Sequence, residues 1–129
     1  MTSSKDRTIL IVEDNEMNMK LARDVLEVNG YQIVAATSGE QGLKLAPQTN
    51  PNAVLLDIQL PDLDGVEVFQ RLREDPQTAQ IPVIAFTASV TAVDKSRVKD
   101  AGFDGFVSKP IDLKSFVATV DQVVMGGSK

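Results

Sequence analysis

The sequence contains no cysteine and no histidine. Without cysteine, neither a disulfide framework nor a thiolate metal site is possible. Without histidine, the commonest general base and the commonest zinc ligand are both missing, so triads of the Ser-His or Cys-His kind are excluded. Any chemistry of this chain must therefore use carboxylates, hydroxyls, lysines and backbone groups.

Long apolar runs and excess positive charge are also lacking. No stretch approaches the roughly 18 residues of a membrane span, and the N-terminus lacks the basic-then-apolar pattern of a secretory signal. These absences predict a cytoplasmic location without membrane insertion. The net charge of −5 and the pI near 4.6 would repel a phosphate backbone, so we expect no nucleic-acid binding.

The length favours one domain. With 129 residues and 43% hydrophobic content, the chain has the size of one compact domain with its own core. We expect this domain to span residues 8–124. Residues 1–7 are polar and the chain ends in Gly-Gly-Ser-Lys, so residues 1–7 and 125–129 are predicted to be flexible termini.

Five short apolar runs are separated by segments whose apolar residues have helical spacing. Within each run, apolar residues follow one another without intervening polar residues, as expected of strands covered on both faces. Five repeats of strand then helix predict an α/β fold of the flavodoxin-like, doubly wound kind, with a five-stranded parallel sheet in the order 2-1-3-4-5 and five helices. The predicted strands are Thr8–Val12, Ile33–Ala36, Ala53–Leu56, Pro82–Thr87 and Gly105–Ser108.

The first and last helices have the clearest apolar stripes. The first ends at the stop signal Asn29-Gly30, and its stripe consists of Met17, Leu21, Val25 and Val28. The last begins after Asp112, a residue suited to an N-cap. Its predicted buried face consists of Leu113, Phe116, Val117, Val120 and Val124.

The helices between them have weaker signals. Ser38 and Gln41 form a capping-box start for the second helix, and the third is lined by Val66, Phe69 and Leu72. The fourth lies within Thr91–Ala101 and has only a weak apolar stripe, which predicts a loosely docked, mobile element.

Five polar side chains stand where predicted strands give way to loops. Ligand sites of open α/β sheets form beyond the carboxyl ends of the strands, so we expect these side chains to converge. Each of them alone would be an ordinary surface acid, strand threonine or exposed lysine. Together, three carboxylates, a hydroxyl and an ammonium suit a divalent cation and a phosphoryl group. They are Glu13, Asp14, Asp57, Thr87 and Lys109.

The segment after the third predicted strand partly resembles two other motifs, a phosphatase motif and an EF-hand loop, but it lacks features that each of them requires. Asp62–Val66 matches the D-x-D-G-[TV] opening of haloacid-dehalogenase-type phosphatases, but Pro61 stands where that motif requires a strand. An EF-hand loop would need acids at Leu60 and Arg71. A turn leading into the third helix is the better interpretation of residues 61–65.

Four stretches resemble the signature segments of the receiver domain of two-component response regulators, in the right order and at the right spacings. The stretches are LIVEDNEMN, LLDIQLPDLDG, VIAFTAS and FVSKP, and the resemblance covers about Thr8 to Val124. The segments VEDNEMNMKL and LDIQLP are most similar to those of single-domain, DivK-like regulators. VEDN also resembles receivers within hybrid histidine kinases, although the starting methionine and the polar ends favour a complete small protein.

The resemblance implies a phosphoacceptor site that requires Mg²⁺. Asp57 would accept a phosphoryl group from a phosphohistidine of a histidine kinase or histidine phosphotransfer protein. Asp14 and Asp57 would bind the metal directly, the backbone carbonyl of Gln59 would add a ligand, and Glu13 would act through water. Thr87 and Lys109 would contact the phosphate.

The resemblance also implies a switch. Thr87 would move toward the phosphate, and Phe106 would pack into the space it leaves. Phe106 stands at the position of the family's switch aromatic, although it is most simply a core residue. A downstream protein would then bind the face formed by the fourth helix, the fifth strand and the fifth helix.

The predicted function is a single-domain response regulator in two-component or phosphorelay signalling. Such a protein catalyses its own phosphorylation and dephosphorylation, without turnover of a separate substrate. The alternative is a receiver-like scaffold that binds proteins independently of phosphorylation. The intact acid set and Lys109 favour the regulator.

Overall fold

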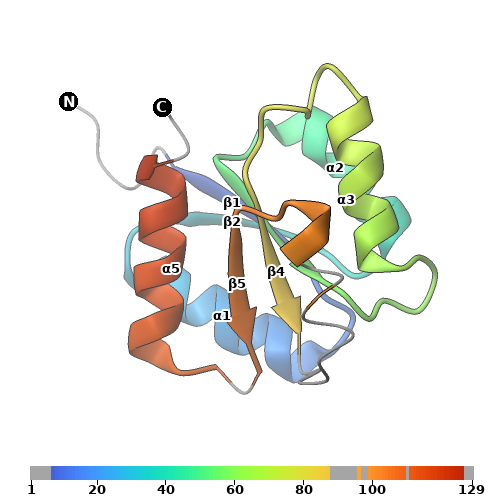
Figure 1. Ribbon diagram of the computed structural model, residues 1–129. Helices are drawn as coiled ribbons and strands as arrows, with labels where there is room; N and C mark the ends of the chain where they lie inside the picture. The colour runs from blue at the N-terminus through green and yellow to red at the C-terminus, as the bar shows by residue number, and fades with distance from the viewer. Residues whose placement is uncertain (1–6, 88–95, 97–98, 110, 127–129) are drawn as a thin grey trace.

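The computed structural model describes residues 7–87, 96, 99–109 and 111–126. The strands form one parallel sheet in the order β2-β1-β3-β4-β5 (Figure 1). This order is the predicted one, and the strand ends differ from the prediction by at most one residue. The strands are β1 (Thr8–Val12), β2 (Gln32–Ala36), β3 (Ala53–Asp57), β4 (Val83–Thr87) and β5 (Gly105–Ser108).

Helices cover both faces of the sheet, which confirms the doubly wound, flavodoxin-like fold. Figure 1 shows α1 and α5 on one side and α2 and α3 on the other. Residues 96 and 99–101, between β4 and β5, are helical, and the remainder of the predicted fourth helix lies outside the described residues. The helices are α1 (Glu16–Val28), α2 (Gly39–Thr49), α3 (Gly65–Glu74) and α5 (Leu113–Gly126).

The core has two layers because successive strand side chains point to opposite faces. In β1, Ile9 and Ile11 lie in the layer with Phe116 of α5, whereas Leu10 and Val12 lie in the layer under α2 and α3. All residues of β3 and β4 are buried, as predicted. The edge strands β2 and β5 are partly exposed, so the prediction of two covered faces is wrong for them.

Only part of the predicted apolar stripe of α1 packs on the sheet, since Val25 is partly buried against the core and the ends of the stripe are exposed. Met17 and Val28 are 81% and 87% exposed, and α1 instead buries Met19, Ala22 and Leu26. The helix carries two apolar stripes, and the one with the small side chain of Ala22 packs on the sheet because it allows close approach. The expectation from sequence favoured the stripe with the larger side chains.

The predicted buried face of α5 is wrong at its first residue. Phe116 and Val120 are buried as predicted, but Leu113 is 53% exposed, and Val123 is buried in addition. Asp112 stands where the helix was predicted to begin: its carbonyl accepts a hydrogen bond from Phe116 N at 2.9 Å.

The other helix boundaries follow the predicted signals. Ser38 Oγ accepts a hydrogen bond from Gln41 N at 3.1 Å and caps α2, whereas the Gln41 side chain bonds Thr37 N instead of completing the capping box. α1 ends at Val28, and Gly30 has a φ of 94°. Asp64 caps α3, so residues 61–65 lead into that helix as predicted and offer no strand to a phosphatase motif.

Two side chains fasten helices to distant parts of the sheet. Arg73, in the last turn of α3, donates hydrogen bonds to Ile81 O and to Asp104 Oδ2, both at 2.6 Å. The Tyr31 hydroxyl, before β2, donates a very short hydrogen bond to Asp121 of α5. Burial, followed by the contact with Asp121, raises the pKa of Tyr31 to about 12, so the phenol remains a donor at any physiological pH.

Candidate functional site

Three acids meet at the carboxyl edge of the sheet. Glu13 follows β1, and Asp57 ends the neighbouring strand β3. One carboxylate oxygen from each of Glu13, Asp14 and Asp57 lies within 4.8 Å of the others. Glu13 and Asp57 are buried, and Asp14 is exposed. The parallel register therefore brings together acids that are more than forty residues apart in the chain.

Lys109 reaches into this acid cluster from the end of β5. Its Nζ lies 2.7 Å from Glu13 Oε1 and 3.2 Å from Asp57 Oδ2. The ammonium also lies 4.7 Å from the centroid of the Phe86 ring, in cation–π geometry. This contact could not be predicted from sequence, because Phe86 has the pattern of any apolar residue within a strand. Phe86 thus supports the cation from below.

Asp57 is held in an environment that disfavours its charge. Burial raises the pKa of Asp57 to about 6, and the charge of Glu13 acts in the same direction. The Gln59 N–H, which donates to Asp57 Oδ1 at 2.9 Å, and the Lys109 ammonium oppose this shift. A further cation at the cluster would favour the ionised form that is needed for nucleophilic attack.

The donor set fits a hard divalent cation. Glu13 Oε1 is buried, and the Lys109 ammonium lies 2.7 Å from it in an ion pair. Its other oxygen accepts a hydrogen bond from Asn15 N at 3.0 Å. Three clustered carboxylates offer the oxygen ligands that Mg²⁺ prefers. The backbone of Gln59 lies next to them through its bond to Asp57.

The structure places Thr87 at the same edge of the sheet. Thr87 ends β4, the strand next to β3, and is 2% exposed. Its carbonyl accepts a hydrogen bond from Lys109 N at 2.9 Å, which links the backbones of these two residues. The strand order therefore brings the predicted hydroxyl residue beside the acids and Lys109.

Phe106 is not a core residue. Its side chain is 37% exposed because β5 is an edge strand, and it borders a hollow with Phe116 and Thr119. The simple interpretation of Phe106 as core is therefore wrong. The switch role implied by the family requires a ring that can change its burial, and a half-exposed ring meets that requirement.

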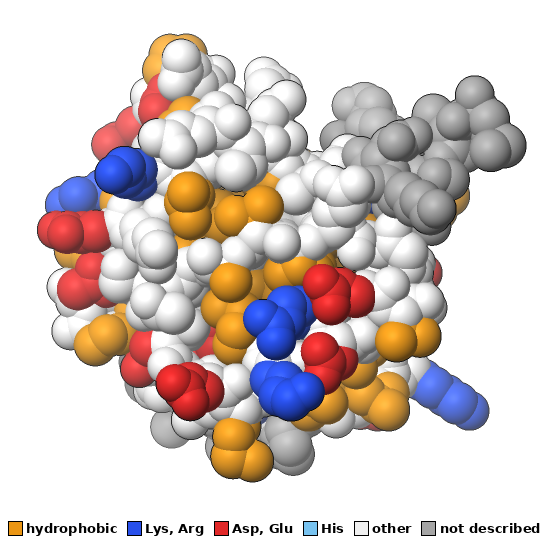
Figure 2. Space-filling view, turned by 180° about the vertical axis from the view of Figure 1, so that it is seen from behind, with side chains coloured by type: hydrophobic (Ala, Val, Ile, Leu, Met, Phe, Trp, Pro, Cys, Tyr) orange, Lys and Arg blue, Asp and Glu red, His pale blue; other side chains and the backbone are white. Residues whose placement is uncertain are grey.

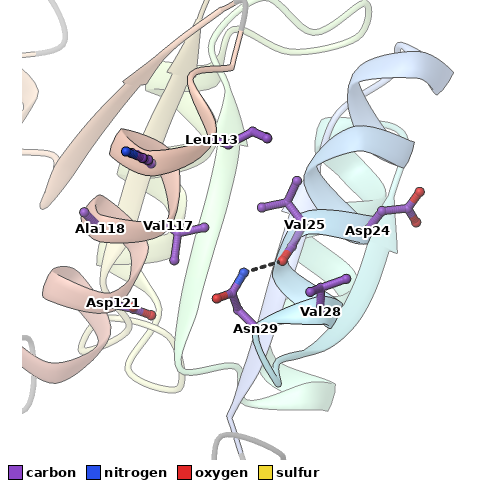
Figure 3. A pocket seen from close by; sticks show the side chains of 9 residues that line it. Asp24, Val25, Val28, Asn29, Leu113, Val117, Ala118 and Asp121 are labelled. Carbon is purple, nitrogen blue, oxygen red and sulfur yellow. Dashed lines mark hydrogen bonds between the residues drawn. The ribbon is translucent and has the colours of Figure 1, made fainter.

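A separate apolar groove of about 650 Å³ lies between α1 and α5. Figure 3 shows Val25 and Val28 of α1 opposite Leu113 and Val117 of α5. None of its lining residues belongs to the acid cluster. Val25 and Val28 of the predicted α1 stripe and the exposed Leu113 of α5 thus border one groove.

The surface has no basic face in the view of Figure 2. Lysine and arginine side chains lie beside acids there, with hydrophobic side chains among them. None of the helices among the described residues is both long and apolar enough to cross a bilayer.

Comparison with known proteins identifies the family. A family model of the response regulator receiver domain matches residues 9–121. The chain is 42% identical over 114 residues to the polar-differentiation response regulator DivK of Brucella ovis, covering 88% of this chain and 93% of the relative. The corresponding protein of Brucella anthropi is 41% identical over the same length, with the same coverage of 88% and 93%.

Solved structures agree with these relatives. The receiver domain of a signal transduction histidine kinase from Syntrophus aciditrophicus is 28% identical, with a TM-score of 0.85 over 93% of this chain and 91% of that one. The receiver domain of a sensor histidine kinase from Pseudomonas aeruginosa, with a magnesium ion coordinated in its active site cleft, is also 28% identical. Its TM-score is 0.84 over 93% of this chain and 98% of that one. This chain therefore belongs to the response regulator receiver domain family.

Proposed function

We propose that Asp57 accepts a phosphoryl group from a phosphohistidine of a histidine kinase or histidine phosphotransfer protein, within a receiver domain of residues 8–124. The observation that carries this proposal is the position of Lys109, whose Nζ bridges the buried carboxylates of Glu13 and Asp57 at 2.7 and 3.2 Å. A surface lysine with no role in a site would extend its ammonium into solvent and would not place it between two buried acids.

The transfer needs one nucleophile and no proton acceptor. An Asp57 carboxylate oxygen attacks phosphorus, so a P–O bond forms and the P–N bond of the donor breaks. The electron pair of that bond returns to the imidazole, which leaves as a neutral ring when its other nitrogen carries a proton. Because the transition state is loose, positioning and charge stabilisation dominate, and a chain without histidine can perform this step.

Four residues would hold Mg²⁺. In this assignment Asp14 and Asp57 bind it directly, Glu13 acts through water, and the Gln59 carbonyl adds a further oxygen. The burial of Glu13 and Asp57 and the spacing of the three carboxylates support this set. When bound, Mg²⁺ supplies positive charge that offsets repulsion between the acids and the incoming phosphate.

Lys109 and Thr87 would hold the transferred group. The Lys109 ammonium is a point charge suited to one phosphate oxygen, and the Thr87 hydroxyl is a donor suited to another. Their backbones are joined by the bond from Lys109 N to Thr87 O. A phosphoryl group on Asp57 would therefore shift the conformations of the ends of β4 and β5 together.

The output would be a change of protein-binding surface. Contacts of Thr87 and Lys109 with the phosphate favour one of two conformations, since a ligand shifts a population by its differential affinity. The half-exposed Phe106 ring on β5 would pack inward in the phosphorylated form. A downstream partner would bind the face of the fourth helix, β5 and α5, as part of two-component or phosphorelay signalling in the cytoplasm.

Phosphorylation can be tested directly by mass. The protein is incubated with a small acyl phosphate donor and Mg²⁺, and the intact mass is measured. We expect the gain of one phosphate on the wild type and none on Asp57→Asn, with both proteins folded by circular dichroism. No gain on the wild type would favour the phosphorylation-independent scaffold, and a gain on Asp57→Asn would place the acceptor elsewhere.

A further inference from the structure

The loop between β3 and α3, residues 58–64, is closed tightly at its base. Gly65 N donates a hydrogen bond to Ile58 O at 2.9 Å. A Cβ on Gly65 would lie 2.5 Å from Ile58 Cα, so only glycine fits at this crossing. At the same end, Gln59 N is bonded to Asp57. The base therefore fixes the two ends of the loop.

The middle of this loop is mostly exposed. Residues 58–64 surround a hollow of about 440 Å³. Gln59, Pro61, Asp62 and Asp64 are exposed, whereas Leu60 and Leu63 are half-buried and pack against the core under α2 and α3. Gln59 and Asp64 form an isolated antiparallel bridge across the loop. The exposed tip of the loop, which includes Asp62, can therefore be held further by contacts with another element.

Asp62 supplies a connection to α2. Its Oδ1 accepts a hydrogen bond from Gly39 N at 2.9 Å, and its Oδ2 accepts one from Glu40 N at 3.0 Å. The third amide of the first turn, Gln41 N, is bonded to Ser38. Two side chains from different parts of the chain thus share the unpaired amides of this helix start.

The rest of the junction is shaped to receive Asp62. A Cβ on Gly39 would lie 3.0 Å from Leu63 Cβ and 3.0 Å from Val68 Cγ2, so the loop approaches α2 closely. The amides of Glu40 and Gly39 hold the pKa of Asp62 below its usual value, so the carboxylate stays charged at neutral pH. The negative charge of Asp62 also interacts favourably with the positive N-terminal end of the α2 dipole.

We propose that Asp62 is a positioning residue, which ties the middle of the β3–α3 loop to α2 and so holds the Gln59 backbone ready for the cation. This inference rests on the proposed function, which assigns the Gln59 carbonyl to Mg²⁺. A loop fixed before binding loses less conformational freedom when the ligand arrives, and this raises affinity without a new contact.

The test compares Asp62→Ala with the wild type in two measurements. Amide hydrogen exchange by NMR reports the loop directly, and calorimetric titration with MgCl₂ reports affinity. In Asp62→Ala we expect exchange of the Gln59 amide, which is bonded to Asp57, to become about tenfold faster. The Mg²⁺ dissociation constant should rise about 3- to 10-fold. Asp62→Asn, which keeps one acceptor oxygen, should lie between the two.

Two matched controls separate positioning from charge and from helix capping. Glu40→Gln removes a negative charge beside Asp62 but keeps both amide bonds. Ser38→Ala removes the other cap of α2 but leaves the loop connected. We expect both controls to bind Mg²⁺ within about twofold of the wild type.

The results separate this inference from the function beneath it. If the wild type binds Mg²⁺ and Asp62→Ala binds equally well, the positioning role is wrong and the proposed function stands. An equal loss in Glu40→Gln would assign the effect to charge, and an equal loss in Ser38→Ala would assign it to α2 itself; either overturns the inference. A wild type that binds no Mg²⁺ overturns both proposals.

Discussion

At the scale of single residues, Asp57 is ionised at neutral pH in a site that opposes its charge. Its pKa rises from 3.8 to about 6 on folding, so the folded state binds more protons than the unfolded state between these values. The free energy of unfolding therefore falls as the pH rises through this window, by roughly 1–3 kcal/mol.

Asp57→Asn removes this penalty. We expect urea unfolding of the variant to show a free energy about 1–3 kcal/mol above that of the wild type at pH 7.5, in the absence of Mg²⁺. The difference should shrink toward pH 4.5, where wild-type Asp57 is largely protonated. An equal difference at both pH values would show that burial of the charge is not its cause.

Lys109 is the counter-ion of two buried acids, and its side chain is only 13% exposed. Lys109→Met leaves these acids unpaired, and we expect a loss of about 2–4 kcal/mol in the free energy of unfolding at neutral pH. The control is Lys20→Met, because the pair of Lys20 with Asp24 is exposed and joins adjacent turns of α1. Its loss should be within about 0.5 kcal/mol. Equal losses would mean that Lys109 contributes no more than a surface charge.

At the scale of elements, Arg73 connects α3 to the two strands at one side of the sheet. It bonds Ile81 before β4 and Asp104 before β5, and Asp104 in turn accepts a hydrogen bond from Val83 N at 2.8 Å. Its guanidinium also lies 4.7 Å above the Phe69 ring. One side chain therefore contributes to three elements.

Arg73→Ala should lower the free energy of unfolding by about 1–3 kcal/mol, because charged hydrogen bonds and ring contact are lost together. Arg71→Ala is the matched control on the same helix, since Arg71 forms an exposed ion pair with Glu67 at 2.5 Å. We expect a loss of about 0.3–0.5 kcal/mol there. Denaturant midpoints measure both, and a similar change in the two variants would contradict the connecting role.

The elements also show what the sequence could predict. The five predicted strands are confirmed, because short uninterrupted apolar runs that end in polar residues have few other interpretations. The predicted packed face of α1 is wrong in part, because two apolar stripes satisfy helical spacing. Only the fit of Ala22 against the sheet decides between them. Phe106 was misjudged because an apolar residue in an edge strand has the same sequence pattern as one in a central strand.

At the scale of the whole molecule, cation binding and folding are coupled, since the acids converge only in the folded sheet. We expect Mg²⁺ at 100 times its dissociation constant to raise the free energy of unfolding by about 2.7 kcal/mol. Asp14→Ala should lose most of this gain, while its stability without metal should change by less than about 0.5 kcal/mol because Asp14 is exposed. An undiminished gain in Asp14→Ala would remove this residue from the metal site.

The residues of the candidate site could be predicted from the sequence, but the tertiary contacts that hold them in place could not. Parallel strands bring their carboxyl ends to one edge whatever the side chains between them, so the strand order alone places Glu13, Asp57, Thr87 and Lys109 together. The connection from Asp62 to α2 and the ring of Phe86 under Lys109 depend on contacts that no spacing encodes. Sequence thus indicates which groups meet, and the tertiary contacts determine how firmly they are held.

Tyr31 lies at the opposite edge of the sheet, where it contacts both Arg7, directly before β1, and Asp121 of α5. The start of the first strand and the later part of the last helix therefore lie beside one another, far from the acids. Such proximity suits circular permutation: a short peptide could join these two parts of the chain, and new ends could be opened in an exposed connection away from the acid cluster. Chain order and site architecture are separable in this fold, since every member of the acid cluster would keep its neighbours.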